Sequence, residues 1–207
     1  METLHLSWQR AWQALAAAGS GVALRDALLA RYAEPHRRYH TLQHLAECIA
    51  QLEPARHLAE HPGEVEIALW FHDAVYELQS KQNEADSAAW AEQALAQAGV
   101  AEAGVRRVGA LVMATRHDAL PSAADEQLLV DVDLAILGAP PARFAEYERQ
   151  VREEYAWVPE PAFQQGRSAV LQQFLQREAI YSTLLFRERL EASARDNLRS
   201  SLAKLAD

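Results

Sequence analysis

The chain has 207 residues, is 50% hydrophobic, and carries 20 Lys and Arg against 29 Asp and Glu, for a formal net charge of −9. Length and apolar content predict a compact domain with a real hydrophobic core. The acidic balance argues against duplex nucleic acid as the partner, because such proteins need a basic surface that displaces phosphate counterions.

Helical periodicity dominates the chain from its start. Apolar residues recur three or four positions apart in successive segments, and Gly or Pro ends most of these segments, as is typical of amphipathic helices. The predicted fold class is therefore all-α. The expected helices lie at residues 8–15, 24–32, 42–52, 65–75, 83–98, 105–115 and 128–138, followed by two or three long helices between 141 and 207.

Residues 128–138 are rich in β-branched side chains and, taken alone, resemble a buried strand. No other convincing strand exists for them to pair with, so a helix is expected. We predict one domain over 1–207, with a helical core at about 20–138 and the C-terminal helices at about 141–207 packed on it.

The lone cysteine, Cys48, excludes an intramolecular disulfide and is expected to be a plain packed thiol. The N-terminus lacks the pattern of a signal peptide, and no stretch reaches the roughly 20 apolar residues of a membrane span. These features predict a cytoplasmic protein with no membrane partner. Its oligomeric state stays open.

Polar residues in apolar surroundings mark the candidate chemistry. His72 and Asp73 follow a run of hydrophobic residues in a segment expected to form a central helix, where an unpaired carboxylate would be costly. A divalent cation would satisfy both side chains at once, since imidazole and carboxylate both bind borderline metals. His40 and His44 lie four residues apart, so on a helix they would share one face.

A second acidic element, Asp131 and Asp133, lies among Leu, Val and Ile. Two residues apart on a helix, these carboxylates point to roughly opposite sides, so one of the two is expected to face the site. Mixed nitrogen and oxygen ligands with open positions are what a hydrolytic metal site requires.

The order of His40, then His72-Asp73, then a distal aspartate resembles the H…HD…D signature of the HD superfamily of metal-dependent phosphohydrolases. The resemblance covers nearly the whole chain. The sequence is similar to that of the bacterial proteins described as predicted HD-superfamily phosphohydrolases. It is carried by residues 38–44, 70–76, 83–84, 114–117, 131–138, 152–155, 166–167 and 194–197.

The resemblance implies an HD-type helical bundle with a C-terminal helical extension and a bound divalent ion, which could be Mn, Fe, Zn, Ni, Co or Mg. His40, His72 and Asp73 would be the first three ligands. Asp133 is favoured over Asp131 as the fourth. His117 lies where HD enzymes with two metals often have a further histidine.

The expected activity is hydrolysis of a small phosphate ester, either a metabolite or a nucleotide, by a metal-activated water. Beside Asp73, the candidate catalytic groups are His44, Glu77 and Glu84, of which the glutamates could deprotonate that water. HD nucleotidases that place a glutamate three residues after the aspartate differ from this chain, which has Tyr76 there. Positive charge for the phosphate could come from Arg37, Arg38, Arg116, Arg152 and Arg167.

Two other functions stay open at this point. One is a di-iron oxygenase of the HD fold, for which His117 and His44 would supply the second set of ligands. The other is a non-catalytic protein that binds a metal or a nucleotide as a sensor. Iron content and an optical response to oxygen would identify the first, and metal binding without turnover the second.

Overall fold

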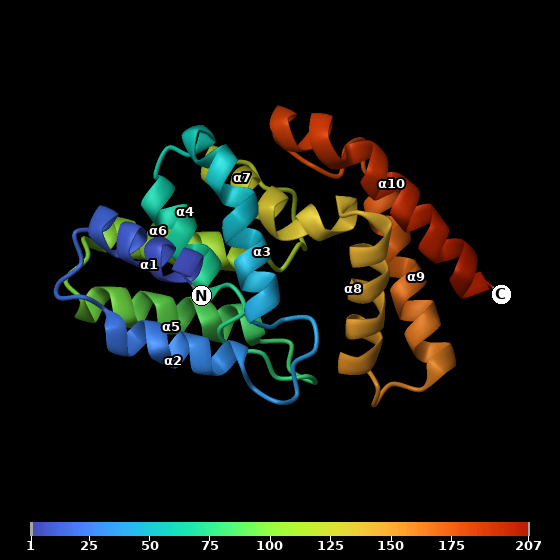
Figure 1. Ribbon diagram of the computed structural model, residues 1–207, viewed down its shortest axis with the longest axis horizontal. Coiled ribbons are helices and arrows are strands. Elements are labelled where there is room, and N and C mark those ends of the chain that lie inside the picture. Colours follow the sequence, from blue (N-terminus) through green and yellow to red (C-terminus); the bar gives the residue numbers. More distant parts are fainter. Residues whose placement is uncertain (1, 207) are drawn as a thin grey trace. The chain divides into compact units, whose positions relative to one another are not determined.

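The computed structural model describes residues 2–206 and confirms the all-α class, with no strand among these residues. Figure 1 shows the helices in chain order. They are α1 (Glu2–Ala14), α2 (Val22–Tyr32), α3 (Leu42–Leu52), η1 (Glu53–Leu58), α4 (Pro62–Phe71), α5 (Asn83–Gln97), α6 (Glu102–Ala114), α7 (Ala124–Asp133), η2 (Leu134–Gly138), α8 (Pro141–Glu154), α9 (Glu160–Gln176) and α10 (Leu184–Ala206).

The chain divides into two compact units, residues 1–133 and 134–207. The first unit includes α1, whose Trp8 and Trp12 are buried in its core. Within residues 2–206, no helix combines the length and apolar character needed to cross a membrane.

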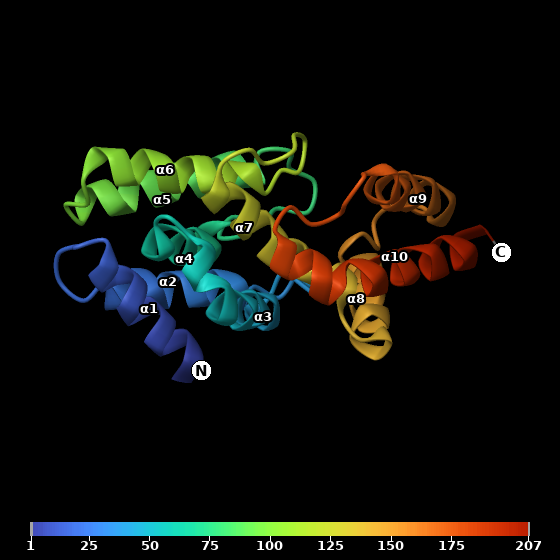
Figure 2. The same cartoon turned by 90° about the horizontal axis from the view of Figure 1, so that it is seen from above.

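Helix α4 is the centre of the first unit, as its apolar sequence predicted. Every residue from Val65 to Phe71 is buried, and α4 contacts α1, α3, α5, α6 and α7. Figure 2 shows α4 between a layer formed by α5 and α6 and a layer formed by α1, α2 and α3. A helix that is apolar on all sides is stable only when neighbours cover it completely.

Aromatic packing joins α1 to α4. Trp8 stacks on Trp12 and meets Trp70 edge to face, with ring centroids 5.1 Å apart in both pairs. The indole N–H of Trp70 donates to the Ser7 hydroxyl at 3.1 Å, so this buried polar group is satisfied. These contacts fix the position of the helix that leads into His72.

One buried charge was not predicted from the sequence. Glu66 lies within α4 and is fully buried, and its carboxylate accepts two hydrogen bonds from Arg10 of α1, at 2.9 and 2.5 Å. Arg56 lies 3.7 Å away. A buried carboxylate is tolerated when paired in this way, and it is costly once its partner is removed.

Arg10→Ala is therefore expected to lower the free energy of unfolding by about 3 kcal/mol, near the low end of the range for a broken buried pair because Arg56 remains nearby. Denaturant unfolding would measure it. Arg106→Ala is the matched control: Arg106 pairs with Glu102 at the surface, where both side chains are more than two-thirds exposed, and its loss should cost about 0.5 kcal/mol or less. An equal decrease in the free energy of unfolding for the two variants would contradict a stabilising role of the buried Arg10–Glu66 pair.

Two helix boundaries differ from the sequence prediction and matter for the site. Helix α4 ends at Phe71, so His72 and Asp73 lie in the turn that follows it and not within a helix. Helix α3 begins at Leu42, because the Thr41 hydroxyl caps it by accepting a hydrogen bond from the backbone N–H of Gln43. His40 consequently precedes the helix that contains His44, and the two do not share a helix face.

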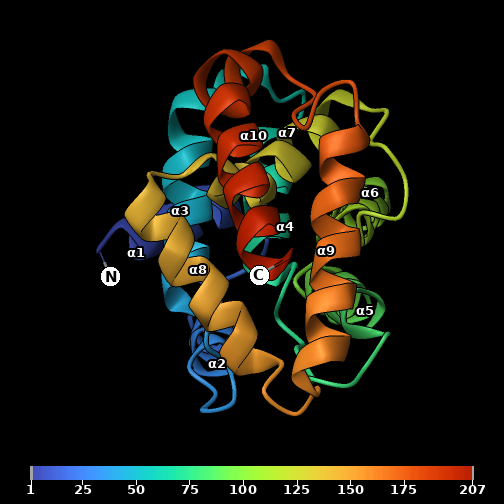
Figure 3. The same ribbon diagram turned by 90° about the vertical axis from the view of Figure 1, so that its right-hand side faces the viewer.

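The second unit consists of η2, α8, α9 and α10 (Figure 3). Residues 134–138 form a 3-10 helix, where the sequence pattern predicted that the preceding helix continues. Helix α10 packs on η2 and α9, and α8 also packs on η2. The Asn197 side chain donates to the carbonyls of Leu137 and Ala139, which holds the end of η2 against α10.

Candidate metal centre

Four side chains of the first unit converge on one point. His44 comes from α3, His72 and Asp73 from the turn after α4, and Asp133 from the last position of α7. The Nε2 atom of His72 lies 3.0 Å from Asp73 Oδ2 and 3.6 Å from Asp133 Oδ1. The Nε2 atom of His44 lies 3.3 Å from each of the same two carboxylate oxygens.

The two imidazoles meet through their Nε2 atoms, which are 3.0 Å apart. The Nε2 atom of His44 thus approaches a nitrogen and two carboxylate oxygens at once, and one N–H proton cannot serve three acceptors. Ligands about 2.1 Å from a shared cation lie about 3.0 Å apart in octahedral and about 3.4 Å apart in tetrahedral geometry. The donor set and its spacing therefore fit a divalent cation.

His72 is held in the orientation that a metal ligand needs. Its Nδ1 atom lies 2.7 Å from the carbonyl oxygen of Leu69, one turn back in α4. A carbonyl only accepts, so Nδ1 carries the proton and the lone pair of Nε2 is directed into the cluster in the neutral ring. Metal-binding histidines in proteins are commonly oriented by such a bond to a backbone carbonyl.

The turn that carries Asp73 is held by the buried guanidinium of Arg37. Arg37 donates to the carbonyls of Asp73 at 2.6 Å, Ala74 at 3.2 Å and His40 at 3.1 Å. The guanidinium also lies over the rings of Tyr32 and Tyr76. Because its side chain is fully buried and its donors are bound to these carbonyls and to the Glu34 carboxylate, Arg37 is placed to position the turn, while its expected role in binding substrate stays a prediction.

His44 makes contacts with His72, Asp73 and Asp133 of the kind that the resemblance led us to expect of His40. The ring of His40 instead stacks on Tyr76, with centroids 4.1 Å apart, and its centroid lies 5.9 Å from that of His44. The difference follows from the start of α3, which sends His44 inward on the helix and leaves His40 in the turn before it. His40 still lies close enough to Asp73 to influence the charge of that carboxylate.

Asp133 links the cluster to His117. Its Oδ1 atom faces His44 and His72, while its Oδ2 atom lies 2.9 Å from Nε2 of His117. His117 has a φ of 57°, a left-handed conformation that few residues other than glycine adopt. The backbone turn after α6 thus brings this imidazole to the carboxylate.

Asp131 is fully buried, whereas Asp133 brings its carboxylate to the histidines. Positions two apart on a helix point to roughly opposite sides, so one of the two is expected to face the histidines. We expect Asp133→Asn to lower the affinity for a divalent metal by more than about tenfold and Asp131→Asn to leave it within about twofold. Equilibrium dialysis of the folded variants would decide, and the opposite ranking would move the ligand to Asp131.

Electrostatics in the cluster favour charged groups despite burial. Burial disfavours protonation of His72, yet the carboxylates of Asp73 and Asp133 raise its pKa well above the usual range. Burial likewise disfavours the carboxylate of Asp73, yet His72, His40 and His44 hold its pKa well below the usual range. The pKa of Asp133 is also held low, against burial, by His117, His44 and His72. The pocket therefore stabilises two negative charges.

The cluster has a buried floor and a more open mouth. The floor consists of His44, Cys48 and His72, none of which is more than 2% exposed. The mouth consists of four partly exposed residues, His40, Asp73, His117 and Asp133. The side chains of Asp73 and Asp133 are 18% and 13% exposed, while the histidines on the floor are shielded from water.

Cys48 belongs to this group, which its sequence context did not reveal. Within residues 2–206, His44, Cys48, His72 and Asp133 offer ligand atoms that all lie within 4.8 Å of one another. This buried group could hold a metal ion. Its position one helical turn after His44 was the only available signal, and apolar neighbours gave Cys48 the pattern of an ordinary core residue.

The two candidate glutamates lie outside this set of contacts. Glu77 is exposed, and its backbone N–H and carbonyl are bound by the side chain of Asn83. Glu84 lies in the first turn of α5 and is partly exposed. Neither glutamate carboxylate contacts His44 or His72 as the carboxylate of Asp73 does.

Three of the remaining candidate arginines also differ in their surroundings. In the second unit, Arg152 donates to Glu160 and to the carbonyls of Tyr155 and Val158. Arg167 bonds Glu148 and lies over the ring of Tyr147. Arg116 follows α6 directly before His117, with 44% of its side chain exposed and Asp118 at 3.3 Å. Of these three side chains, that of Arg116 is the most exposed, and Arg116 adjoins His117 in the sequence.

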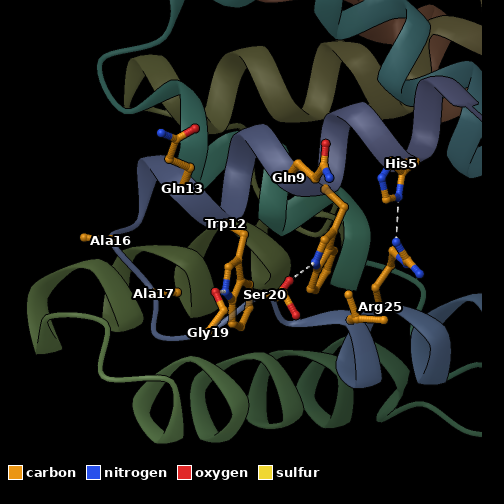
Figure 4. Close-up of a pocket in the computed structure, with 11 residues that line it drawn as sticks. His5, Gln9, Trp12, Gln13, Ala16, Ala17, Gly19, Ser20 and Arg25 are labelled. Atoms are coloured by element: carbon orange, nitrogen blue, oxygen red, sulfur yellow. Dashed lines mark hydrogen bonds between the residues drawn. The ribbon is translucent and has the colours of Figure 1, made fainter.

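A separate hollow of about 540 Å³ lies between α1 and the start of α2. Figure 4 shows His5, Gln9 and Arg25 along it, with His5 Nδ1 bound to the guanidinium of Arg25 at 2.6 Å. The indole N–H of Trp12 donates to the carbonyl of Gly19 at 3.1 Å, so the loop itself uses this donor. The hollow contains none of the residues of the metal cluster.

No known protein family, curated protein or solved structure matches the chain. The assignment of a function therefore depends on the chemistry of the cluster.

Proposed function

We propose that the protein is a metal-dependent phosphohydrolase of the HD type, acting on a small phosphorylated metabolite or nucleotide as a phosphomonoesterase or phosphodiesterase. The observation that carries the proposal is the convergence of His44, His72, Asp73 and Asp133 within 3.0–3.6 Å. The order of these residues along the chain, H…HD…D, is that of the HD superfamily, with His44 in place of His40.

A divalent cation held by these four residues would supply a water of lowered pKa and a positive charge for the phosphate. The chain's own residues would do the rest. The imidazole N–H of His40, at the mouth, is suited to donate a hydrogen bond to a phosphate oxygen. His117, whose Nε2 atom is bound to Oδ2 of Asp133, would hold that carboxylate in place. The guanidinium of Arg116, next to His117, is suited to pair with a further oxygen.

The buried histidines of the floor and the guanidinium of Arg37 would support the same hydrolysis. His44 and His72 are shielded from water, which strengthens electrostatic interactions with a bound phosphate. Arg37 holds the backbone of Asp73, which keeps that carboxylate directed at the floor. The mechanism thus uses rigid placement of charge, which is the main contribution of proteins that catalyse phosphoryl transfer.

The test is turnover of a broad panel of phosphate monoesters and diesters by metal-stripped protein, supplied in turn with Mn, Co, Ni, Fe, Zn and Mg. We expect hydrolysis of at least one ester class that depends on added metal and is lost in Asp73→Ala. Metal binding without turnover of any ester would favour the sensor function. Tightly bound iron with an optical change on exposure to oxygen would favour the oxygenase.

A further inference from the structure

The single cysteine of the chain lies on the floor of the metal centre. Cys48 is 2% exposed and follows His44 by one turn of α3. Its Sγ atom is 3.7 Å from both Nδ1 and Nε2 of the His44 ring. It also lies within 4.8 Å of ligand atoms of His72 and Asp133.

The spacing suits a shared cation. A sulfur about 2.3 Å from a metal and an imidazole nitrogen about 2.1 Å from it lie about 3.1 Å apart at the 90° angle of a site with five or six ligands and about 3.6 Å apart at the tetrahedral angle. Cys48 Sγ lies 3.7 Å from both ring nitrogens of His44, over the face of that ring, so a cation on Nε2 would draw the Cys48 side chain toward His72. The helix provides the placement, because residues four apart lie on one face of α3 and both side chains are directed toward His72.

We propose that Cys48 is a sulfur ligand of this metal centre. The proposal rests on the proposed metal site and adds a soft donor to its histidines and aspartates. The thiol loses its proton to solvent as the bond between Sγ and the metal forms, because the thiolate is the ligand form. A set that includes thiolate and imidazole favours Zn, Fe or Co, whereas carboxylates alone suit Mg and Mn.

Cobalt(II) reports both the site and the sulfur in one spectrum. Bound in a site of low coordination number, it shows visible d–d bands, and a cysteine ligand adds a sulfur-to-cobalt charge-transfer band in the near ultraviolet. The chain has one cysteine, so a cysteine-derived band can come from Cys48 alone. The experiment is titration of metal-stripped protein with Co²⁺, using the wild type, Cys48→Ser and His72→Ala.

For the wild type we expect both sets of bands at one equivalent of Co²⁺. Cys48→Ser should keep the d–d bands and lose the charge-transfer band. His72→Ala retains the thiol and should lose both, which shows that the band arises from the centre. Direct titration of metal-stripped protein with Zn²⁺ should show an affinity roughly 10–100-fold lower for Cys48→Ser than for the wild type, with little change for Mg²⁺.

The outcomes separate the two proposals. Wild-type d–d bands without a charge-transfer band would overturn sulfur ligation and leave the metal centre intact. Absence of any cobalt bands in the folded wild type would overturn both. If Cys48→Ser does not fold, as circular dichroism would reveal, the wild-type spectrum still decides, since no other cysteine exists.

Discussion

Asp73→Ala is expected to lose metal binding, with the affinity for a divalent ion reduced by more than about 100-fold. Loss of a residue that only supports a metal ligand costs up to about 100-fold, and loss of a ligand should cost more. Asp73 presents its Oδ2 atom to both His72 and His44, at 3.0 and 3.3 Å. Without this carboxylate, the two imidazoles keep one carboxylate partner, Asp133. Any ester hydrolysis that needs the metal should be lost in the same variant.

Metal content after dialysis against a limiting divalent ion would measure the loss of Asp73. Asp86→Ala provides a matched control, because Asp86 is an exposed aspartate in the first turn of α5. We expect it to bind metal as the wild type does. Full metal occupancy in folded Asp73→Ala would remove Asp73 from the ligand set.

Arg37→Lys is expected to lower the free energy of unfolding by about 3 kcal/mol and metal affinity by roughly 10–100-fold. A lysine keeps the charge but cannot span the three carbonyls of His40, Asp73 and Ala74 that the guanidinium binds together. Buried carbonyls left without donors are costly, and the turn that holds Asp73 would lose its support.

The same variant separates positioning from substrate binding. If Arg37 bound a phosphate ester, Arg37→Lys would raise KM and leave both unfolding and metal affinity unchanged. Arg38→Lys is the neighbouring control, since Arg38 is exposed and donates to the carbonyl of Pro35. We expect it to unfold and bind metal like the wild type. An Arg37→Lys protein of wild-type stability and metal affinity would contradict the positioning role.

Much of the fold could be predicted from periodicity alone. The apolar stripes and the Gly and Pro breaks indicated most of the helices, and the largely apolar α4 was correctly placed at the centre of its unit. The exact end of α4 was missed, because Phe71 and Val75 continue its hydrophobic pattern past the point where the backbone turns. Hydrophobicity reports burial and does not report where hydrogen bonding of a helix stops.

The choice between His40 and His44 depended on one capping residue. Both histidines fit the sequence signature, and only the start of α3 at the Thr41 cap shows which of them enters the floor. The role of Arg37 was beyond the sequence, because its partners lie up to 37 residues away. The left-handed backbone at His117 could not be read from the sequence either.

The most direct test of the metal centre is a crystal structure of the protein grown with a divalent transition metal, with the ion located by anomalous scattering. We predict a peak within bonding distance, about 2.0–2.3 Å, of Nε2 of His44, Nε2 of His72 and the carboxylates of Asp73 and Asp133. A peak elsewhere in the molecule, or a folded protein that retains no metal with these four residues intact, would contradict the assignment.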